Sequence, residues 1–366
     1  FFILNSSLFI PLNPHLASTR EIILALENEI STTIIGQKDL IRKLITALFA
    51  GGHVLIEWVP GLGKTKTVKT LASVLGYDFK RISFTPDLLP SDLTGNEIYR
   101  PQTSKFEIRK WPIFTHILLA DEINRTPPKV QSALLEAMEE GQVTIGEKSL
   151  PLPSPFFVIA TENPLEHEGT YPLPEAELDR FLMKIMISYP SPEDEKKIFR
   201  WTEREDVTSS VKISPTELIE IQKYIEENIK VDEKIYDYIS GILEATRFRH
   251  LWEGTSEEEK NPALSFRSMR NLAGKEQDIS WRRYDGKSNM LQYIEYWAST
   301  RAGLALIRCA RVWALLEDRD FVMPEDIKSL AHEILRHRIG LSYEAVSEDI
   351  TTDMIIKNIL DTVRIP

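Results

Sequence analysis

The segment Pro60-Gly61-Leu62-Gly63-Lys64-Thr65 constrains this chain of 366 residues more than any other feature. It lies between a short apolar run, Val54-Leu55-Ile56, and a helical pattern that continues from Lys64 to Leu75. Glycines let a backbone approach a phosphate chain closely, a helix N-terminus attracts the anion, and a lysine adds a cation. A strand, a glycine-containing loop and a helix in this order predict a phosphate-binding loop within an α/β sheet.

Further residues complete the predicted site. Lys64 is expected to reach the β- and γ-phosphates, and the Thr65 hydroxyl to coordinate Mg²⁺. The apolar run 117–120 ends in Asp121-Glu122, where the first carboxylate can hold the cation through water and the second can polarise an attacking water. Asn163 ends the next apolar run and is expected to position that water. The first glycine of the usual phosphate-loop motif is replaced here by Trp58.

The first half of the chain alternates apolar runs with helical patterns. We expect strands over 54–56, 79–84, 116–120, 156–161 and 183–187, a helix over 128–140 ended by Gly141, and a small hairpin over 142–150. Continuous apolar strands separated by helices predict a parallel sheet that is covered on both faces. In the second half we expect helices over 192–205, 215–227, 232–246, 299–316 and 324–337.

These patterns predict two domains. The first is a three-layer P-loop α/β core with a parallel sheet over residues 18–190. The second is an all-α lid domain over 191–345, with a polar insertion at about 250–291, and a C-terminal helix or tail follows over 346–366.

Composition excludes several classes of protein. The net charge of −11 and the isoelectric point near 5.3 argue against a broad surface for nucleic acid or anionic membranes. No apolar run reaches the roughly 18 residues of a transmembrane helix, and the apolar start lacks the basic flank of a signal peptide. The single cysteine, Cys309, excludes an internal disulfide framework and fits a reducing compartment, so we expect a cytoplasmic protein.

Several motifs, in order, resemble the MoxR family of AAA+ ATPases. The resemblance is dense over about 35–187 and returns at 293–341. It rests on Phe84-Thr85-Pro86-Asp87-Leu88-Leu89-Pro90-Ser91-Asp92-Leu93-Thr94-Gly95, Asp121-Glu122-Ile123-Asn124-Arg125, Glu162-Asn163-Pro164, Gly169-Thr170-Tyr171-Pro172-Leu173-Pro174-Glu175-Ala176 and Leu178-Asp179-Arg180-Phe181. The family implies binding and hydrolysis of ATP with Mg²⁺, used for chaperone-like remodelling or maturation of client proteins.

The resemblance also implies roles for single residues. Lys64 and Thr65 resemble the Walker A pair, Asp121 and Glu122 the Walker B pair, and Asn163 the sensor 1 residue. The hairpin at 142–150 resembles an insertion that lines the pore of a ring. The expected nucleotide-binding residues are Gln37 near the adenine, and Pro60, Gly61, Leu62, Gly63, Lys64, Thr65 and Lys66 along the loop; the expected metal ligands are Thr65 and Asp121.

The resemblance gives roles to two arginines, and the first implies an oligomer. Arg180 resembles the arginine finger, which acts on the γ-phosphate of the neighbouring subunit, and Arg301 resembles sensor 2 on the lid. Such a finger stabilises the charge that develops in phosphoryl transfer and raises kcat by about 10³–10⁵-fold. We therefore expect a ring homo-oligomer, a hexamer, with a client protein and a von Willebrand factor A domain protein as further partners.

Three tryptophans, Trp58, Trp111 and Trp297, stand where the family has glycine. Glycine serves where φ is positive or where backbones approach closely, and a bulky left-handed residue costs about 1–2 kcal/mol. The chain has 16 glycines in 366 residues, about 4%, against a usual value of about 7%. We therefore hypothesise that opal codons at these positions were decoded as tryptophan, which ordinary UGG codons in the gene would contradict.

Two other functions stay open at this point. A genuine Trp58 would fit a nucleotide-binding scaffold with weak or no hydrolysis. A nucleic-acid motor or transcription activator is disfavoured by the acidic charge, and neither a helix-turn-helix segment nor a Gly-Ala-Phe-Thr-Gly-Ala loop is evident in the sequence.

Overall fold

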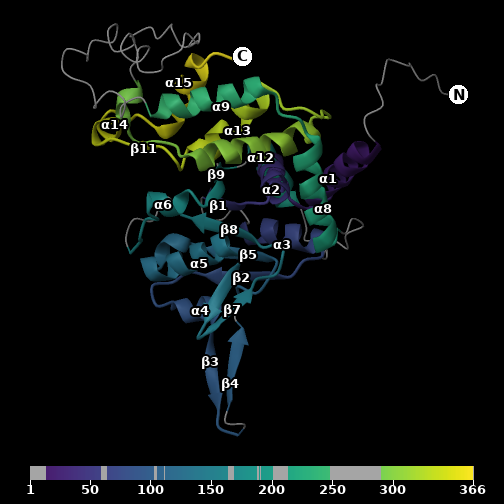
Figure 1. Cartoon of the computed structure of the whole chain (residues 1–366), viewed down its shortest axis with the longest axis vertical. Helices are drawn as coiled ribbons and strands as arrows, with labels where there is room; N and C mark the ends of the chain where they lie inside the picture. The colour runs from purple at the N-terminus through teal and green to yellow at the C-terminus, as the bar shows by residue number, and fades with distance from the viewer. Residues whose placement is uncertain are drawn as a thin grey trace, which may run out of the picture. The chain divides into compact units, whose positions relative to one another are not determined.

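The structure is a computed structural model (Figure 1), and it describes residues 14–58, 64–102, 105–110, 112–163, 169–187, 189, 191–200, 213–247 and 290–365. The described residues form two compact units. The first unit draws on 1–173, 185–230 and 311–322, and the second on 174–184, 231–310 and 323–366. The domain boundaries near 190 and 345 stay predictions, and nearly all of the insertion predicted at 250–291 lies outside the described residues.

A five-stranded sheet has the strand order β2-β5-β8-β1-β9. Its strands are β1 (His53–Trp58), β2 (Phe79–Ser83), β5 (Ile117–Asp121), β8 (Phe157–Glu162) and β9 (Phe181–Ile187). The pairs β1–β8, β8–β5 and β5–β2 are parallel, which confirms the predicted parallel α/β core. Every residue of β5 is buried, as its unbroken apolar run predicts for a strand covered on both faces, whereas β2 lies at the edge and exposes three of its five residues.

The first unit also contains helices, two of which contact this sheet. They are α1 (Pro14–Thr33), α2 (Lys38–Phe49), α3 (Lys64–Leu75), α4 (Pro90–Thr94), α5 (Pro128–Glu140), α7 (Pro192–Arg200) and α8 (Pro215–Asn228). Helix α2 packs on β1, α3 packs on β5, and α1 contacts both helices. Gly141 ends α5 with a positive φ of 62°, as its position after the last helical residue predicts.

Two antiparallel hairpins leave the sheet. The predicted one consists of β6 (Gln142–Ile145) and β7 (Lys148–Pro151). The other, β3 (Gly95–Arg100) with β4 (Lys105–Lys110), was not among the sequence predictions, and Figure 1 shows it extending away from the sheet. A Cβ on Gly146, whose φ is +60°, would lie 2.7 Å from the carboxylate carbon of Glu97, so the turn of the first hairpin abuts β3.

The second unit is mainly helical. Its elements are α6 (Glu175–Leu178), α9 (Glu233–Thr246), η3 (Met290–Tyr293), β10 (Ile294–Tyr296), α12 (Thr300–Leu316), α13 (Pro324–Leu335), β11 (Gly340–Leu341), α14 (Tyr343–Ser347) and α15 (Thr352–Thr362), with the end of α12 in the first unit. Helices α9, α13 and α15 pack together. A Cβ on Gly303 would lie 3.1 Å from Leu243 Cδ1, so α12 approaches α9 closely. In the described part of the chain, none of the helices has the length and apolar character needed to cross a bilayer.

Candidate active site

Three neighbouring strands end at the same edge of the sheet. Strand β8 lies between β1 and β5, and the pairs Glu57–Glu162 and Ala120–Ala160 keep the strand ends nearly level. Strand β1 leads toward α3, β8 ends beside the buried Asn163, and β5 ends at Asp121-Glu122. Asn163 directly follows β8, the strand between β1 and β5. Neighbouring strands are about 4.8 Å apart, so Asn163 comes between the ends of β1 and β5.

The first turn of α3 carries part of the predicted phosphate loop. Thr65 is half-buried, and Lys66 is exposed. Thr67, which is buried, donates a hydrogen bond to Oε1 of Gln37 at 3.1 Å, so the structure brings Gln37 to this helix. Residues 60–63 and the side chain of Lys64 lie outside the described residues.

Asp121 is a buried carboxylate, only 3% exposed. Its Oδ1 accepts a hydrogen bond from the Thr161 hydroxyl at 2.8 Å, and its Oδ2 accepts one from Nε of Arg81 at 3.1 Å. Thr161 belongs to β8 and Arg81 to β2, the strands on either side of β5. Both neighbouring strands therefore hold the carboxylate predicted to bind a cation, and a charged acceptor makes such hydrogen bonds stronger than neutral ones.

Glu122 adopts a left-handed backbone conformation, with φ 60° and ψ 51°. For a residue with a Cβ, this conformation costs about 1–2 kcal/mol. The Glu122 N–H donates to Oγ1 of Thr161 at 3.0 Å, and its carboxylate pairs with Nε of Arg125 at 3.0 Å. The Thr161 hydroxyl thus holds both acidic residues, the first by donating and the second by accepting.

The residues present fit a magnesium ion that arrives with phosphates. Mg²⁺ prefers oxygen ligands and is usually held by one or two protein oxygens together with substrate phosphates and water. The Thr65 hydroxyl and the Asp121 carboxylate are ligands of this kind. Within the described residues, no group of three or more His, Cys, Asp or Glu side chains could hold a metal ion on its own.

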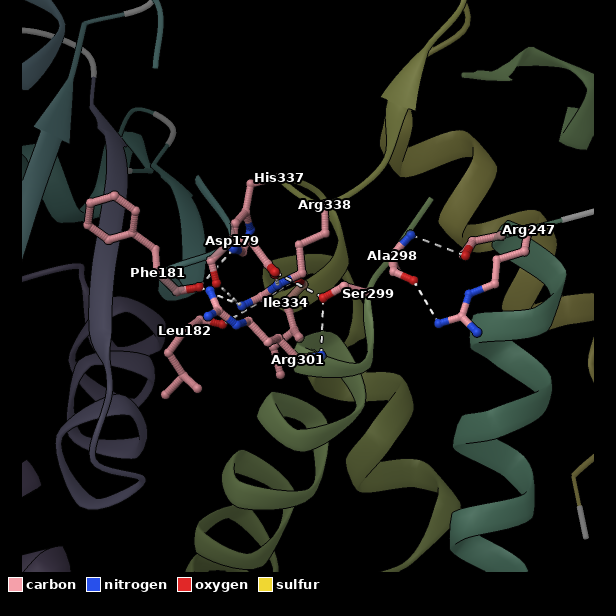
Figure 2. Close-up of polar contacts among 11 residues, drawn as sticks. Asp179, Phe181, Leu182, Arg247, Ala298, Ser299, Arg301, Ile334, His337 and Arg338 are labelled. Carbon is pink, nitrogen blue, oxygen red and sulfur yellow. Dashed lines mark hydrogen bonds and ion pairs between the residues drawn. The ribbon is translucent and has the colours of Figure 1, made fainter. Parts of the chain in front are cut away.

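The two predicted arginines belong to the second unit. Arg180 lies half-buried between α6 and β9, and Arg301 is exposed in the first turn of α12. Their surroundings, in which Asp179 is bound by Ser299 and Arg338 (Figure 2), were not among the sequence predictions. Thr161 and Arg81 were not predicted either. A polar residue in an otherwise apolar strand could have indicated Thr161, whereas Arg81 becomes visible only once the strands pair.

The structure narrows the reason why a glycine would be needed at 297. Trp297 is 43% exposed, and the non-glycine residues with positive φ in the described parts of the chain are Glu122, Asp318 and Asp349. Of the two reasons for glycine, a positive φ does not apply at Trp297, and the decoding hypothesis stays a prediction. The side chain of Trp58 and all of Trp111 lie outside the described residues.

A parallel sheet whose adjacent strands lead to the helix of the predicted phosphate loop, to a buried asparagine and to an acidic pair is an α/β fold with its site at the carboxyl ends of the strands. Residues 53–183 match the family model described as the ATPase family associated with various cellular activities (AAA), and residues 288–359 match the AAA lid domain.

Individual relatives make the family specific. The chain is 39% identical to Chaperone MoxR1 of Mycobacterium tuberculosis, covering 92% of this chain and 81% of that protein. It is 30% identical to Protein MoxR of Methylorubrum extorquens, covering 93% and 94%. A crystal structure described as that of an ATPase from Cytophaga hutchinsonii has a TM-score of 0.79 at 41% identity and covers 96% of this chain and 97% of that chain. The chain belongs to the MoxR family of AAA ATPases.

Proposed function

We propose that the chain binds and hydrolyses ATP with Mg²⁺ and uses the reaction to remodel or mature a client protein. The observation that carries the proposal is the Thr161 hydroxyl, which holds Asp121 and Glu122 together where β5 and β8 end. Phosphoryl transfer depends on positioning, so carboxylates that bind a cation and activate a water need to be held in fixed places.

Each residue has a step in the proposed reaction. Lys64 binds the β- and γ-phosphates. Thr65, and Asp121 through water, would hold a Mg²⁺ ion, which would neutralise charge on those phosphates. Glu122 turns from Arg125 to the attacking water, which Asn163 orients, and accepts the proton of that water. The water oxygen bonds to the γ-phosphorus while the bond from that phosphorus to the β–γ bridging oxygen breaks, and ADP leaves with its charge on that oxygen. In the proposed ring, Arg180 stabilises the transition-state charge at the neighbouring site, and Arg301 contacts the nucleotide of its own subunit.

The test is steady-state hydrolysis of Mg²⁺-ATP. We expect Lys64→Ala to lose nucleotide binding, and Glu122→Gln to bind nucleotide while turnover falls by about 10²–10⁴, the typical loss of a general base. The chain as written is compared with a form that has glycine at 58, 111 and 297. Turnover by the glycine form alone supports the ATPase proposal and makes the tryptophans suspect, whereas nucleotide binding without turnover by either assembled form favours the scaffold.

We further propose a homo-hexameric ring that acts on protein. MoxR1 is named a chaperone, and a finger that acts on a neighbour needs assembly. Native mass measurement of Glu122→Gln with ATP is expected to give six copies, and a lone monomer would contradict the ring.

Action on a client is tested separately. If the chain prevents an unfolded model protein from aggregating and Lys64→Ala does not, client remodelling is supported. ATP-dependent pull-down of a von Willebrand factor A domain protein would support it as well. A salt-sensitive shift of DNA instead would favour a nucleic-acid motor.

A further inference from the structure

The guanidinium of Arg338 lies at the centre of a buried cluster in the second unit (Figure 2). Its side chain is 3% exposed. Nε donates to Oδ1 of Asp179 at 2.6 Å. The two terminal nitrogens donate to the main-chain carbonyls of Asp179, Phe181, Leu182 and Ile334. A guanidinium has five N–H donors, so these acceptors use all of them.

Three of these carbonyls surround the predicted finger. Asp179 precedes Arg180 and Phe181 follows it, so Arg338 binds the backbone on both sides of Arg180. The contact with Leu182 extends the hold into β9. A lysine has a single nitrogen and could not reach all these acceptors at once.

The Asp179 carboxylate connects the same turn to the start of α12. Its Oδ2 accepts a hydrogen bond from the Ser299 hydroxyl at 2.9 Å. The Ser299 oxygen accepts the backbone N–H of Arg301 at 3.1 Å and so caps the helix that carries Arg301. Ala298 is fixed in turn by Thr246 and Arg247 at the end of α9, so the cap has a firm base.

Charge makes this connection stiff. Burial lowers the pKa of Arg338, and the hydrogen bond and charge of Asp179 oppose that shift. Breaking a buried pair by removing one partner is strongly destabilising, because the other charge stays buried and uncompensated. Arg180 is thus connected to Arg301 in three steps: Asp179 is its neighbour in sequence, Ser299 binds Asp179, and Ser299 caps the helix of Arg301. The contact between Ser299 and Asp179 joins two segments that lie 120 positions apart in sequence.

We propose that Asp179, Ser299 and Arg338 are positioning residues that couple Arg180 to Arg301, so that nucleotide bound at Arg301 in one subunit changes how Arg180 is presented to the next. The inference rests on the proposed function. It differs from a purely structural role because it requires both arginines to respond when the polar link between them is cut.

Ser299→Ala cuts the link while the Arg338–Asp179 pair remains, so the variant is expected to fold. Coupling between two sites typically changes affinity by about 5–150-fold, so the loss of one link is expected to weaken nucleotide binding in dilute chain and to lower kcat at saturating ATP by about tenfold each. The Hill coefficient for ATP is expected to fall toward one. Ser299→Thr keeps the hydroxyl and is expected to restore all three.

The matched control is Asp353→Asn. Asp353 pairs with Arg336 at 2.8 and 3.0 Å in the same unit, and Arg336 also reaches the β9 backbone at Lys184. Among the described residues, the hydrogen bonds of this pair reach β9 at Lys184 and not residues 179–182 or 299–301. Its loss should therefore leave binding, kcat and the Hill coefficient unchanged. Equal changes in Ser299→Ala and Asp353→Asn would overturn the coupling, as would a change in only binding or only kcat.

A second readout needs no hydrolysis. Cys309 is the chain's one cysteine and is buried, so an environment-sensitive fluorophore on Arg180→Cys labels a single accessible thiol. ATP is expected to change its emission, with no change once Ser299→Ala is added. An emission that stays constant at saturating ATP overturns the coupling. A wild-type chain that binds no nucleotide refutes the proposed function instead.

Discussion

Replacing Thr161 by valine tests how the acidic pair is held. The side chain is fully buried, and its hydroxyl donates to Asp121 and accepts from the Glu122 N–H. Valine has nearly the same shape, so the substitution removes these two hydrogen bonds without leaving a cavity. The effect on stability and on turnover therefore reports the hydroxyl itself.

The magnitude follows from the two bonds. A hydrogen bond to a charged group contributes about 1.5–3 kcal/mol, and a buried N–H left without a partner costs about 1–3 kcal/mol. A methyl in place of the hydroxyl recovers about 1 kcal/mol of apolar burial. We expect Thr161→Val to lower the free energy of unfolding of the first unit by about 2–4 kcal/mol. Turnover should fall by about 10²-fold, because Glu122 loses the contact that fixes its left-handed backbone, and a misplacement of about 1 Å can cost that much.

Urea unfolding and steady-state ATP hydrolysis measure the two effects. The control is Thr161→Ser, which keeps the hydroxyl and loses one methyl, so we expect a cost of about 1 kcal/mol and near-normal turnover. The reasoning is refuted if valine lies within about 0.5 kcal/mol of the wild type, the usual range of a neutral substitution, and hydrolyses ATP at the same rate.

Three other perturbations have expected outcomes. Burial lowers the pKa of His53 to about 4; since the unfolded state binds a proton below about 6.5, acid should weaken folding, by roughly 2 kcal/mol at pH 5. Urea midpoints at pH 7 and 5 should converge in His53→Gln, and an unchanged pH dependence would contradict the argument. Arg81→Gln removes the positive charge of the guanidinium beside Oδ2 of Asp121, so half-maximal hydrolysis should need about threefold to tenfold less Mg²⁺. A magnesium titration measures this, and a higher requirement for Mg²⁺ would show that Arg81 instead orients the Asp121 carboxylate. Trp58→Gly should raise ATP turnover if a glycine belongs there, and equal rates would show that the phosphate loop accepts tryptophan.

The central sheet could be predicted from sequence because its strands are unbroken apolar runs. Strand β5 needs apolar residues on both faces, and its five residues are all buried. The hairpin of β3 and β4 could not be found in this way. Its strands mix charged and apolar residues, and no Asn-Gly or Asp-Gly pair marks its turn. The order of the strands also needed the structure, because pairing depends on contacts between residues far apart in the chain.

Part of the candidate site could likewise be predicted from sequence, whereas the residues that support it could not. Asp121, Glu122 and Asn163 could be proposed because each stands at the end of an apolar run, and ligands bind at the carboxyl ends of parallel strands. Their supports lie within strands: Thr161 and Arg81 are each 40 positions from Asp121 and meet it only through strand pairing. For this reason the sequence indicates what the site can bind but not what holds its groups in place.

This division has a consequence for how substitutions act. The Glu122 side chain pairs with the partly exposed Arg125, and an ion pair of this kind contributes only about 0–1 kcal/mol. Glu122→Gln should therefore lower turnover and leave the free energy of unfolding nearly unchanged. A support is bonded on several sides within the protein, so Thr161→Val should lower turnover and stability together. Ser299 is a partly exposed cap with one link to Asp179, and its loss should lower turnover with little loss of stability. Plotting turnover against unfolding free energy therefore separates groups that react, groups that hold the site and groups that connect two parts of it.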